Sequence, residues 1–248
     1  MDESTISQSR TASVSRPKLD MRSVSLGLEL RLSGESVVLL PQKAVWWPAR
    51  STVLIADTHF GKAATFRSHG IPIGDESLEQ DLERLSEIVN HTSADRVVVL
   101  GDLLHARRGR SPQTLARITR WRTQHRALAV ELVRGNHDRA AGPPVEDWQM
   151  GILPDEHREG PFAFCHYPKD VAGAYVLAGH LHPKIVVPFE AAGKAKLACF
   201  WIRPQHAVLP AFGSFIDSAA VAPLPEDRVY AIAESHVHDV TALTVRSR

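Results

Sequence analysis

The chain has 248 residues, enough for one substantial core, and its 29 basic and 28 acidic residues give a formal net charge of +1. This balance excludes a global attraction to nucleic acid or membranes, so an anionic substrate must be bound by local charge. Two cysteines exclude a disulfide framework, and no segment has the roughly 18 apolar residues of a membrane span or the apolar core of a signal peptide. We therefore expect a cytoplasmic protein.

The N-terminal segment differs in composition from the rest. Residues 1–20 are rich in Ser, Thr and Arg and poor in large apolar side chains. Such a segment cannot bury enough surface to offset the entropy lost on ordering. We expect a disordered tail over residues 1–20 and, because nothing in the remainder requires a second core, a single domain over residues 21–248.

The first part of the domain alternates predicted strands with predicted helices. Short apolar runs predict strands at residues 26–32, 36–40, 44–48, 52–56, 97–102, 128–133, 162–165 and 175–178. Apolar residues at three-and-four spacing, with Gly and Pro stops, predict helices near residues 62–69, 75–89 and 115–122. The arginines of the last helix, Arg117, Arg120 and Arg122, are expected on its solvated face.

The last third of the chain changes character. Strands are predicted at residues 185–189, 196–202, 207–209 and 229–233, joined by Gly and Pro turns and without a long helical pattern. A β-rich C-terminal half that packs against a βα N-terminal half predicts an α/β (α+β) fold, with two facing sheets and helices outside.

Polar residues that bind metals follow five of the apolar runs. They are Asp57, His59, Asp102, Asn136, His166, His180 and His182. This layout is typical of a metal centre at the carboxyl edge of an α/β sheet. Imidazole, carboxylate and amide ligands without thiolate clusters favour manganese, iron or zinc.

The number of ligands indicates two ions. Seven ligands exceed the needs of one ion, whereas two ions that share the Asp102 carboxylate would use them all and leave positions for water. Such a pair generates a hydroxide nucleophile for phosphoester hydrolysis.

The order of these motifs resembles a known family. Asp57-Thr58-His59, Gly101-Asp102, Gly135-Asn136-His137-Asp138, His166 and Gly179-His180-Leu181-His182 resemble the motifs of calcineurin-like metallophosphoesterases. The resemblance implies a four-layer αββα sandwich of two mixed β-sheets flanked by helices, with a dinuclear centre. It implies one ion at Asp57, His59 and His182, the other at Asn136, His166 and His180, and Asp102 as the bridge.

The same resemblance implies a catalytic role for His137 beside Asp102. His137 would either stabilise the phosphoryl transition state or protonate the leaving oxygen. For His105 and Asp138 two interpretations stay open: they orient the ligands, or they are merely polar residues at strand tips.

The sequence around the motifs narrows the substrate. Protein phosphatases of this family carry Asp-Arg-Gly after the central Gly-Asp and Glu after Asn-His, whereas this chain has residues 103–110 and Asp138 there. Leu39-Leu40-Pro41, Trp46-Trp47-Pro48 and residues 59–67 are similar instead to bacterial ligase-associated DNA damage response endonucleases. That similarity implies a manganese-dependent phosphodiesterase and DNA endonuclease, found with an ATP-dependent DNA ligase, an exonuclease and a helicase, and acting in DNA repair.

Local charge is compatible with DNA as the substrate. The predicted substrate-binding residues are Asn136, Lys62, Arg67, Arg107 and Arg108, all near strand-tip ligands. Phe60 and Phe66 are candidates for base stacking, with burial in the core as the alternative for Phe66. The neutral overall charge argues against a processive duplex binder, so we expect a single-stranded or flexible substrate. Two alternative functions are a small-molecule or cyclic-nucleotide phosphodiesterase or phosphatase, and a repair-complex scaffold with weak activity.

Overall fold

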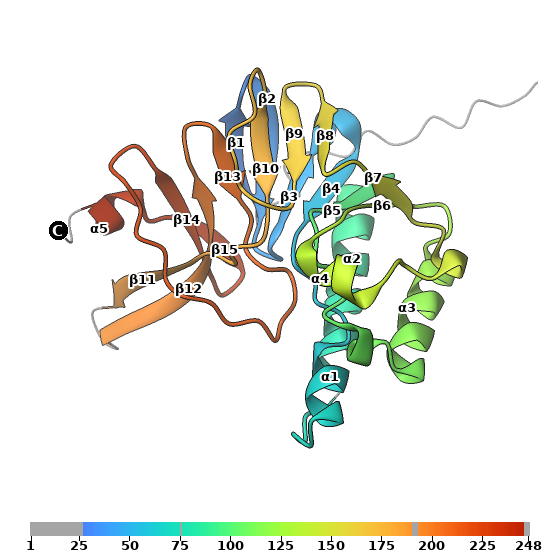
Figure 1. Ribbon diagram of the computed structural model, residues 1–248. Helices are drawn as coiled ribbons and strands as arrows, with labels where there is room; N and C mark the ends of the chain where they lie inside the picture. The colour runs from blue at the N-terminus through green and yellow to red at the C-terminus, as the bar shows by residue number, and fades with distance from the viewer. Residues whose placement is uncertain (1–26, 75, 190–192, 246–248) are drawn as a thin grey trace, which may run out of the picture.

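The predicted strands assemble into two mixed β-sheets in the computed structural model, which describes residues 27–74, 76–189 and 193–245. Figure 1 shows the two sheets and the helices beside them. The fold is the expected α/β arrangement of two mixed sheets flanked by helices. The tail predicted over residues 1–20 lies outside the described residues.

The first sheet has the strand order β1-β2-β3-β4-β5-β6-β7. These strands are β1 (Leu28–Leu32), β2 (Glu35–Leu40), β3 (Ala44–Trp47), β4 (Thr52–Ile55), β5 (Arg96–Val99), β6 (Ala129–Val133) and β7 (Gly151–Leu153). Strands β1 to β4 pair antiparallel, and β4 to β7 pair parallel. All four residues of β4 are buried, as is usual for a parallel strand covered on both faces. The carboxyl ends of β4, β5 and β6 therefore lie at one edge.

The second sheet has the order β15-β14-β12-β13-β10-β9-β8, with β11 paired to β12. Its strands are β8 (Glu156–Glu159), β9 (Phe162–Cys165), β10 (Tyr175–Ala178), β11 (Lys184–Phe189), β12 (Gly193–Ile202), β13 (His206–Val208), β14 (Arg228–Ala233) and β15 (His236–Asp239). Within it β9, β10 and β13 run parallel. The carboxyl ends of β9 and β10 are thus neighbours as well.

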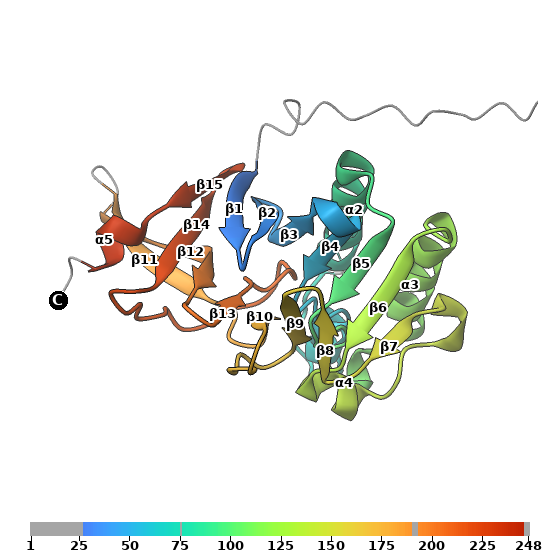
Figure 2. The ribbon, with the colours of Figure 1, turned by 90° about the horizontal axis from the view of Figure 1, so that it is seen from above.

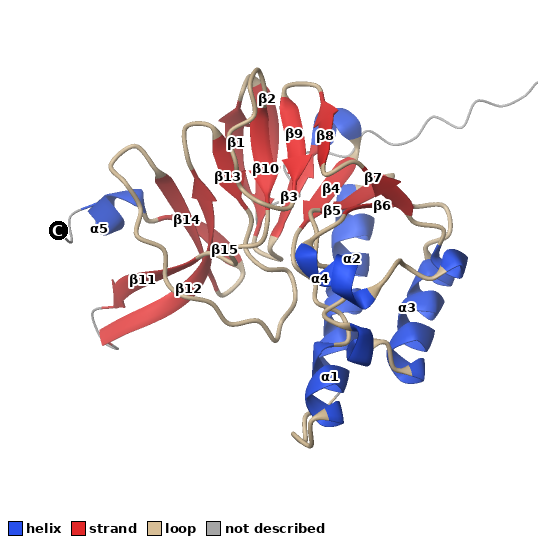
Figure 3. Cartoon of the chain, viewed as in Figure 1, coloured by secondary structure: helices blue, strands red, loops and turns tan. Residues whose placement is uncertain are grey.

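Most helices cover the first sheet. They are α1 (Lys62–Ser68), α2 (Glu76–Thr92), α3 (Pro112–Gln124) and α4 (Asn136–Ala141), with α5 (Thr241–Val245) near β14 and short 3-10 turns η2 (Pro48–Arg50), η3 (Arg107–Gly109) and η4 (Glu146–Trp148). Figure 3 shows this uneven distribution. The apolar stripe of α2 packs on the sheet together with Trp121 of α3. In the described part of the chain, no helix is long and apolar enough to cross a membrane.

The core between the sheets is built from alternating strand residues. Trp47, Leu54 and Val98 of the first sheet pack with Phe162 and Phe200 of the second. The neighbouring tryptophans point to opposite faces: Trp47 is buried between the sheets, whereas Trp46 packs against the helix-side core. Figure 2 views the same layers from above.

Some elements were not predicted. Helix α4 starts at Asn136, inside a motif, and is too short to show an apolar period. Strands β7, β8 and β15 and helix α5 are likewise short, and the three strands contain no fully buried residue. Short elements of this kind depend on tertiary contacts more than on local sequence preference.

The expectation that Arg122 lies on a solvated helix face was wrong. Its side chain is buried, and its guanidinium donates hydrogen bonds to the carbonyl oxygens of Trp148 (2.8 Å), His125 (3.1 Å) and Leu128 (3.1 Å). Arg120 is exposed, as expected. Arg122 therefore joins α3 to the η4 turn and to the segment before β6.

We predict that Arg122→Met lowers the free energy of unfolding by about 3 kcal/mol, because it removes the three hydrogen bonds that the buried guanidinium donates to carbonyl oxygens. Arg120→Met, on the same helix, should change it by less than about 0.5 kcal/mol. Urea unfolding of both variants measures the difference. Equal stability of the two variants would contradict the structural role of Arg122.

Candidate metal centre

The residues expected at the centre meet because the strands that carry them are neighbours. Asp57 follows β4, Asp102 follows β5 and Asn136 begins α4 just after β6, while His166 and the His180–His182 pair follow β9 and β10. Hydrogen bonds join the two sheets at this edge; in one of them the amide of His180 donates to Asp57 Oδ2 at 2.8 Å. All seven predicted ligands lie together.

Their ligand atoms form two adjoining groups. In the first, His182 Nε2 lies 3.3 Å from His59 Nε2 and 3.4 Å from Asp57 Oδ1. In the second, His166 Nε2 lies 3.1 Å from Asn136 Oδ1 and 3.2 Å from His180 Nδ1.

Asp102 stands between the groups. Its Oδ2 atom lies 3.7 Å from His59 Nε2 in the first group and 3.6 Å from His166 Nε2 in the second. A carboxylate in this position can bridge two cations.

The protonation pattern fits cations at this position. His166 Nδ1 donates to the carbonyl oxygen of Leu100 at 3.0 Å, which leaves Nε2 as the ring atom that faces Asn136 Oδ1 and His180 Nδ1. Among the described side chains, buried Asp57 Oδ1 has no hydrogen-bond partner. Burial, reinforced by nearby histidines, lowers the pKa of His59 to about 2, which keeps its imidazole neutral. Facing lone pairs and an orphaned carboxylate oxygen are what a bound cation would satisfy.

The backbone turns sharply at these residues. Five of the seven have positive φ, in the left-handed region that L residues rarely adopt: Asp57 (54°), His59 (46°), Asp102 (55°), His180 (72°) and His182 (47°). Residues held in such conformations cost free energy that the surrounding structure must supply, and they cluster at functional sites. The turns bring side chains from parallel strands to a common point.

Asp138 holds the centre from behind. Its buried carboxylate accepts hydrogen bonds from the amides of Asp102 (2.7 Å), Gly135 (2.9 Å) and Leu104 (3.1 Å). Asp102 Oδ1 in turn accepts one from the amide of His137 at 2.9 Å. Asp138 thus links the loops after β5 and β6. Of the two interpretations, these bonds favour the one in which Asp138 orients the predicted ligands.

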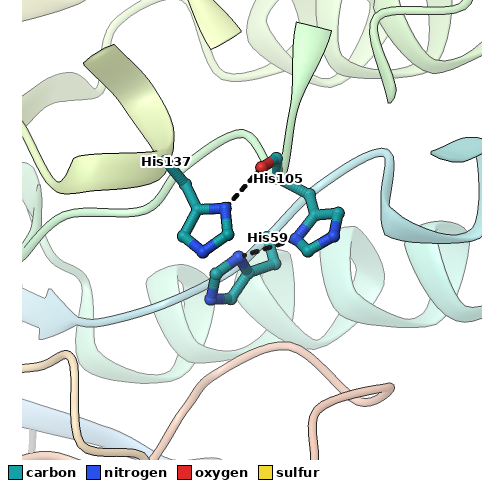
Figure 4. Close-up of side chains that lie close together, drawn as sticks. All are labelled: His59, His105 and His137. Atoms are coloured by element: carbon teal, nitrogen blue, oxygen red, sulfur yellow. Dashed lines mark hydrogen bonds between the residues drawn. The ribbon is translucent and has the colours of Figure 1, made fainter. Parts of the chain in front are cut away.

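His105 and His137 lie against His59, as Figure 4 shows. His137 Nδ1 donates to the carbonyl oxygen of His105 at 2.6 Å, and the two rings stack with centroids 5.0 Å apart. His105 Nδ1 lies 3.2 Å from His59 Nδ1. Burial, followed by the effects of His137 and Lys62, lowers the pKa of His105 to about 4. His105 therefore contacts both a predicted ligand and the predicted catalytic imidazole.

The predicted substrate-binding cations occupy different environments. Lys62 is half-buried and lines a pocket together with His59; burial lowers the pKa of its ammonium. Arg107 and Arg108 are exposed on η3, and Arg108 Nη1 lies 3.0 Å from His69 Nε2. Arg67 Nη1 donates to the carbonyl oxygen of Ile73 at 2.9 Å, so this arginine orders its own loop. Their contact with substrate stays a prediction.

Tyr167 was missed by the sequence analysis, although it follows His166 directly. Its hydroxyl donates to Asn136 Oδ1 at 3.2 Å, and its ring centroid lies 4.5 Å from that of His180. The side chain is 45% exposed. Tyr167 therefore forms part of the surface of the second ligand group. Phe60, considered for base stacking, is buried in the core instead.

The chain is similar to one protein family and to solved structures of known proteins. A family model described as calcineurin-like phosphoesterase matches residues 51–238. The crystal structure of the Pseudomonas putida nuclease MPE is 37% identical, with a TM-score of 0.76, and the match covers 86% of this chain and 99% of that one. A phosphoesterase from E. coli, Yfce, is 14% identical with a TM-score of 0.39, over 77% of this chain and 98% of that one. No curated protein matches the chain.

We predict that Gly179→Ala disrupts the centre. An added Cβ would lie 2.5 Å from Asp57 Oδ2, 2.7 Å from the Cβ of Ala56 and 3.0 Å from the oxygen of Leu100. Overpacking of this kind costs about 1 to 3 kcal/mol and would displace the Asp57 carboxylate. Thermal unfolding and calorimetric titration with Mn²⁺ should reveal lower stability and weaker metal binding.

The matched control is Gly151→Ala, whose methyl group would meet only the flexible side chain of Glu131. Its stability and metal affinity should stay near those of the unaltered protein. If Gly179→Ala behaves like this control, the close approach at Gly179 is not needed.

Proposed function

The chain belongs to the calcineurin-like phosphoesterase family. We propose that it is a manganese-dependent DNA endonuclease that hydrolyses phosphodiester bonds in single-stranded or flexible DNA. Family membership and the similarity to a nuclease support a metal-dependent phosphoesterase with nuclease activity. One observation carries the finer proposal: two adjoining groups of imidazole and carboxylate ligands share Asp102 and contain an orphaned carboxylate oxygen.

In this proposal Asp57, His59 and His182 hold one divalent ion, and Asn136, His166 and His180 hold the other, with Asp102 as the bridge. The family uses a dinuclear centre, and neutral imidazoles with carboxylates suit manganese, with iron or zinc as alternatives. When bound, the ions lower the pKa of a water molecule to give the nucleophile and neutralise charge on the phosphoryl group.

The residues around the ions position the substrate and move a proton. Because His137 Nδ1 donates to the carbonyl oxygen of His105, its Nε2 is the atom available to the substrate. In its protonated form this atom donates to the leaving oxygen, which makes His137 the proposed general acid. The backbone bond from His137 to Asp102 fixes the imidazole relative to the bridging carboxylate.

The choice of DNA rests on local charge and on the similar nuclease. Arg107 and Arg108 are exposed cations close to the Asp102 loop, where they would contact the phosphates that flank the scissile one. We further propose a role in DNA repair in the cytoplasm, together with an ATP-dependent ligase, an exonuclease and a helicase. The two free cysteines, Cys165 and Cys199, are both buried and suit a reducing compartment.

We predict that Asp102→Asn abolishes hydrolysis of both a chromogenic phosphodiester and labelled single-stranded DNA. Loss of the bridging charge should lower each rate by more than about 100-fold, given that even residues one step removed from a metal contribute 10- to 100-fold. The assay compares Mn²⁺ with a chelator, and Asp95→Asn, which alters an exposed aspartate, is the matched control.

The two substrates separate the possible functions. Manganese-dependent cleavage of both by the unaltered protein supports the endonuclease. Cleavage of the small diester alone would point to a small-molecule phosphodiesterase. An absence of metal-dependent activity on either substrate, with ligase or helicase binding that survives Asp102→Asn, would point to a scaffold.

We predict that the double variant Arg107→Gln/Arg108→Gln loses DNA cleavage preferentially. Two lost phosphate contacts should flatten the dependence of log affinity on log salt by about 1.4, since each contact to a single strand contributes about 0.7. The measurement is DNA binding at several salt concentrations. Arg120→Gln/Arg126→Gln removes the same charge from exposed positions on and after α3 and should leave the slope unchanged.

A further inference from the structure

The long loop from β13 to β14, residues 209–227, lies against the segment that carries two predicted ligands. The amide of Phe212 donates to the carbonyl oxygen of Ala56 at 2.7 Å, and that of Gly213 donates to the carbonyl oxygen of Asp57 at 3.2 Å. Gly213 allows this approach, because a Cβ there would lie 2.4 Å from the oxygen of Thr58. The loop is therefore attached directly to the backbone of the centre.

Helix α2 holds the same loop from the other side. The buried carboxylate of Asp81 accepts hydrogen bonds from the amide and the hydroxyl of Ser214. Arg84 donates to the carbonyl oxygen of Phe212, and its guanidinium lies 4.3 Å from the centre of the Phe212 ring. The backbone just before Phe215 is thus fixed by side chains of α2 as well as by β4.

Phe215 is exposed although its loop is anchored. Its side chain is 45% exposed, whereas that of Phe212, three residues earlier, is fully buried. Its ring meets the ring of Phe66 edge to face at 5.7 Å, and Lys62 Nζ lies 5.7 Å from the centre of Phe215 and 5.9 Å from that of Phe66. An exposed aromatic ring beside a cation is the usual composition of a site for single-stranded nucleic acid.

This pair adjoins the first ligand group. Lys62 and Phe215 line the same pocket as His59, so the pair lies beside one of the predicted ligands. A small phosphodiester would reach the ligand groups without extending that far. A contact at Phe215 would therefore favour a nucleic-acid chain over a small substrate.

We propose that Phe215 stacks against a base of the DNA strand next to the scissile phosphate, while Lys62 binds the adjacent phosphate. This inference rests on the proposed endonuclease function and extends it. Stacking is tolerant of sequence because every base has a π face, and it requires an unpaired base. It would bind single strands on a protein whose overall charge is nearly neutral.

The test compares kcat/KM for a single-stranded oligonucleotide with kcat/KM for a chromogenic phosphodiester. For Phe215→Ala the DNA-to-diester ratio should fall about tenfold, within the range for loss of one base stack. Phe215→Leu, which keeps apolar bulk without the ring, should lose as much, and Phe215→Trp should restore the ratio. Ile152→Ala, which removes an exposed apolar side chain from β7, should leave the ratio unchanged.

Single abasic positions placed along the oligonucleotide locate the base. In the unaltered protein one abasic position near the cleavage site should lower cleavage about tenfold, and in Phe215→Ala the same position should have no further effect. If the losses caused by the abasic position and by Phe215→Ala add, the stacking role is overturned and the endonuclease function is not. The same holds if the DNA-to-diester ratio of kcat/KM is unchanged in a folded Phe215→Leu protein. Failure of the unaltered protein to cleave DNA would overturn the proposed function and this inference together.

Discussion

The structure depends on one electrostatic constraint: two buried carboxylates, Asp57 and Asp102, lie among imidazoles whose ring nitrogens face one another and the carboxylate oxygens. Burial and the proximity of Asp57 raise the pKa of Asp102, while burial lowers the pKa of His59. In most protein cores such groups would find hydrogen-bond donors. Here the carbonyl of Leu100 and the amides around Asp138 fix the orientations of the ligands while their coordinating atoms stay directed at one another. The carboxylates and ring nitrogens of this site therefore still require positive charge to balance them.

The topology of the two sheets is what allows these groups to converge. Ligands can converge from both sheets only where the carboxyl ends of parallel strands meet, and both sheets place their parallel strands there. The inter-sheet core, with Trp47 against Phe162, holds the two edges in register. That packing must offset the cost of left-handed backbone at residues such as Asp57 and His182. Gly179 contributes by its lack of a Cβ, since any larger residue would collide with the Asp57 carboxylate.

The sequence predicted the buried strands, the long helices and the convergence of the ligand motifs, because apolar runs followed by Asp, Asn or His mark buried parallel strands that end at a site. It did not predict the burial of Arg122, because the carbonyl groups of His125 and Leu128, just after α3, and of the distant Trp148 accept its hydrogen bonds only once the chain has folded. Nor did it predict the positive φ angles, since the preference of Asp and His for the left-handed region is too weak to mark individual residues. Phe215 was missed for a similar reason: it lies about 150 residues after Lys62 in the chain, and only the loop from β13 to β14 brings the two together.

The loop from β13 to β14 adds a surface residue, Phe215, beside the predicted metal ligands. In the proposed function the ligand groups bind a phosphate, which nucleotides, phosphoproteins and small diesters all present, so discrimination between these substrates would come from the surrounding surfaces. On the side of His59 the surface is Lys62 with Phe215, and on the side of His180 it is Tyr167, each aromatic ring about half exposed. Both aromatic residues are held by contacts to the ligand segments themselves, Phe215 through its loop backbone and Tyr167 through Asn136. In the proposed function, the segments that carry the predicted ligands also anchor Phe215 and Tyr167, so the position of a bound strand and the position of the nucleophile would be set together.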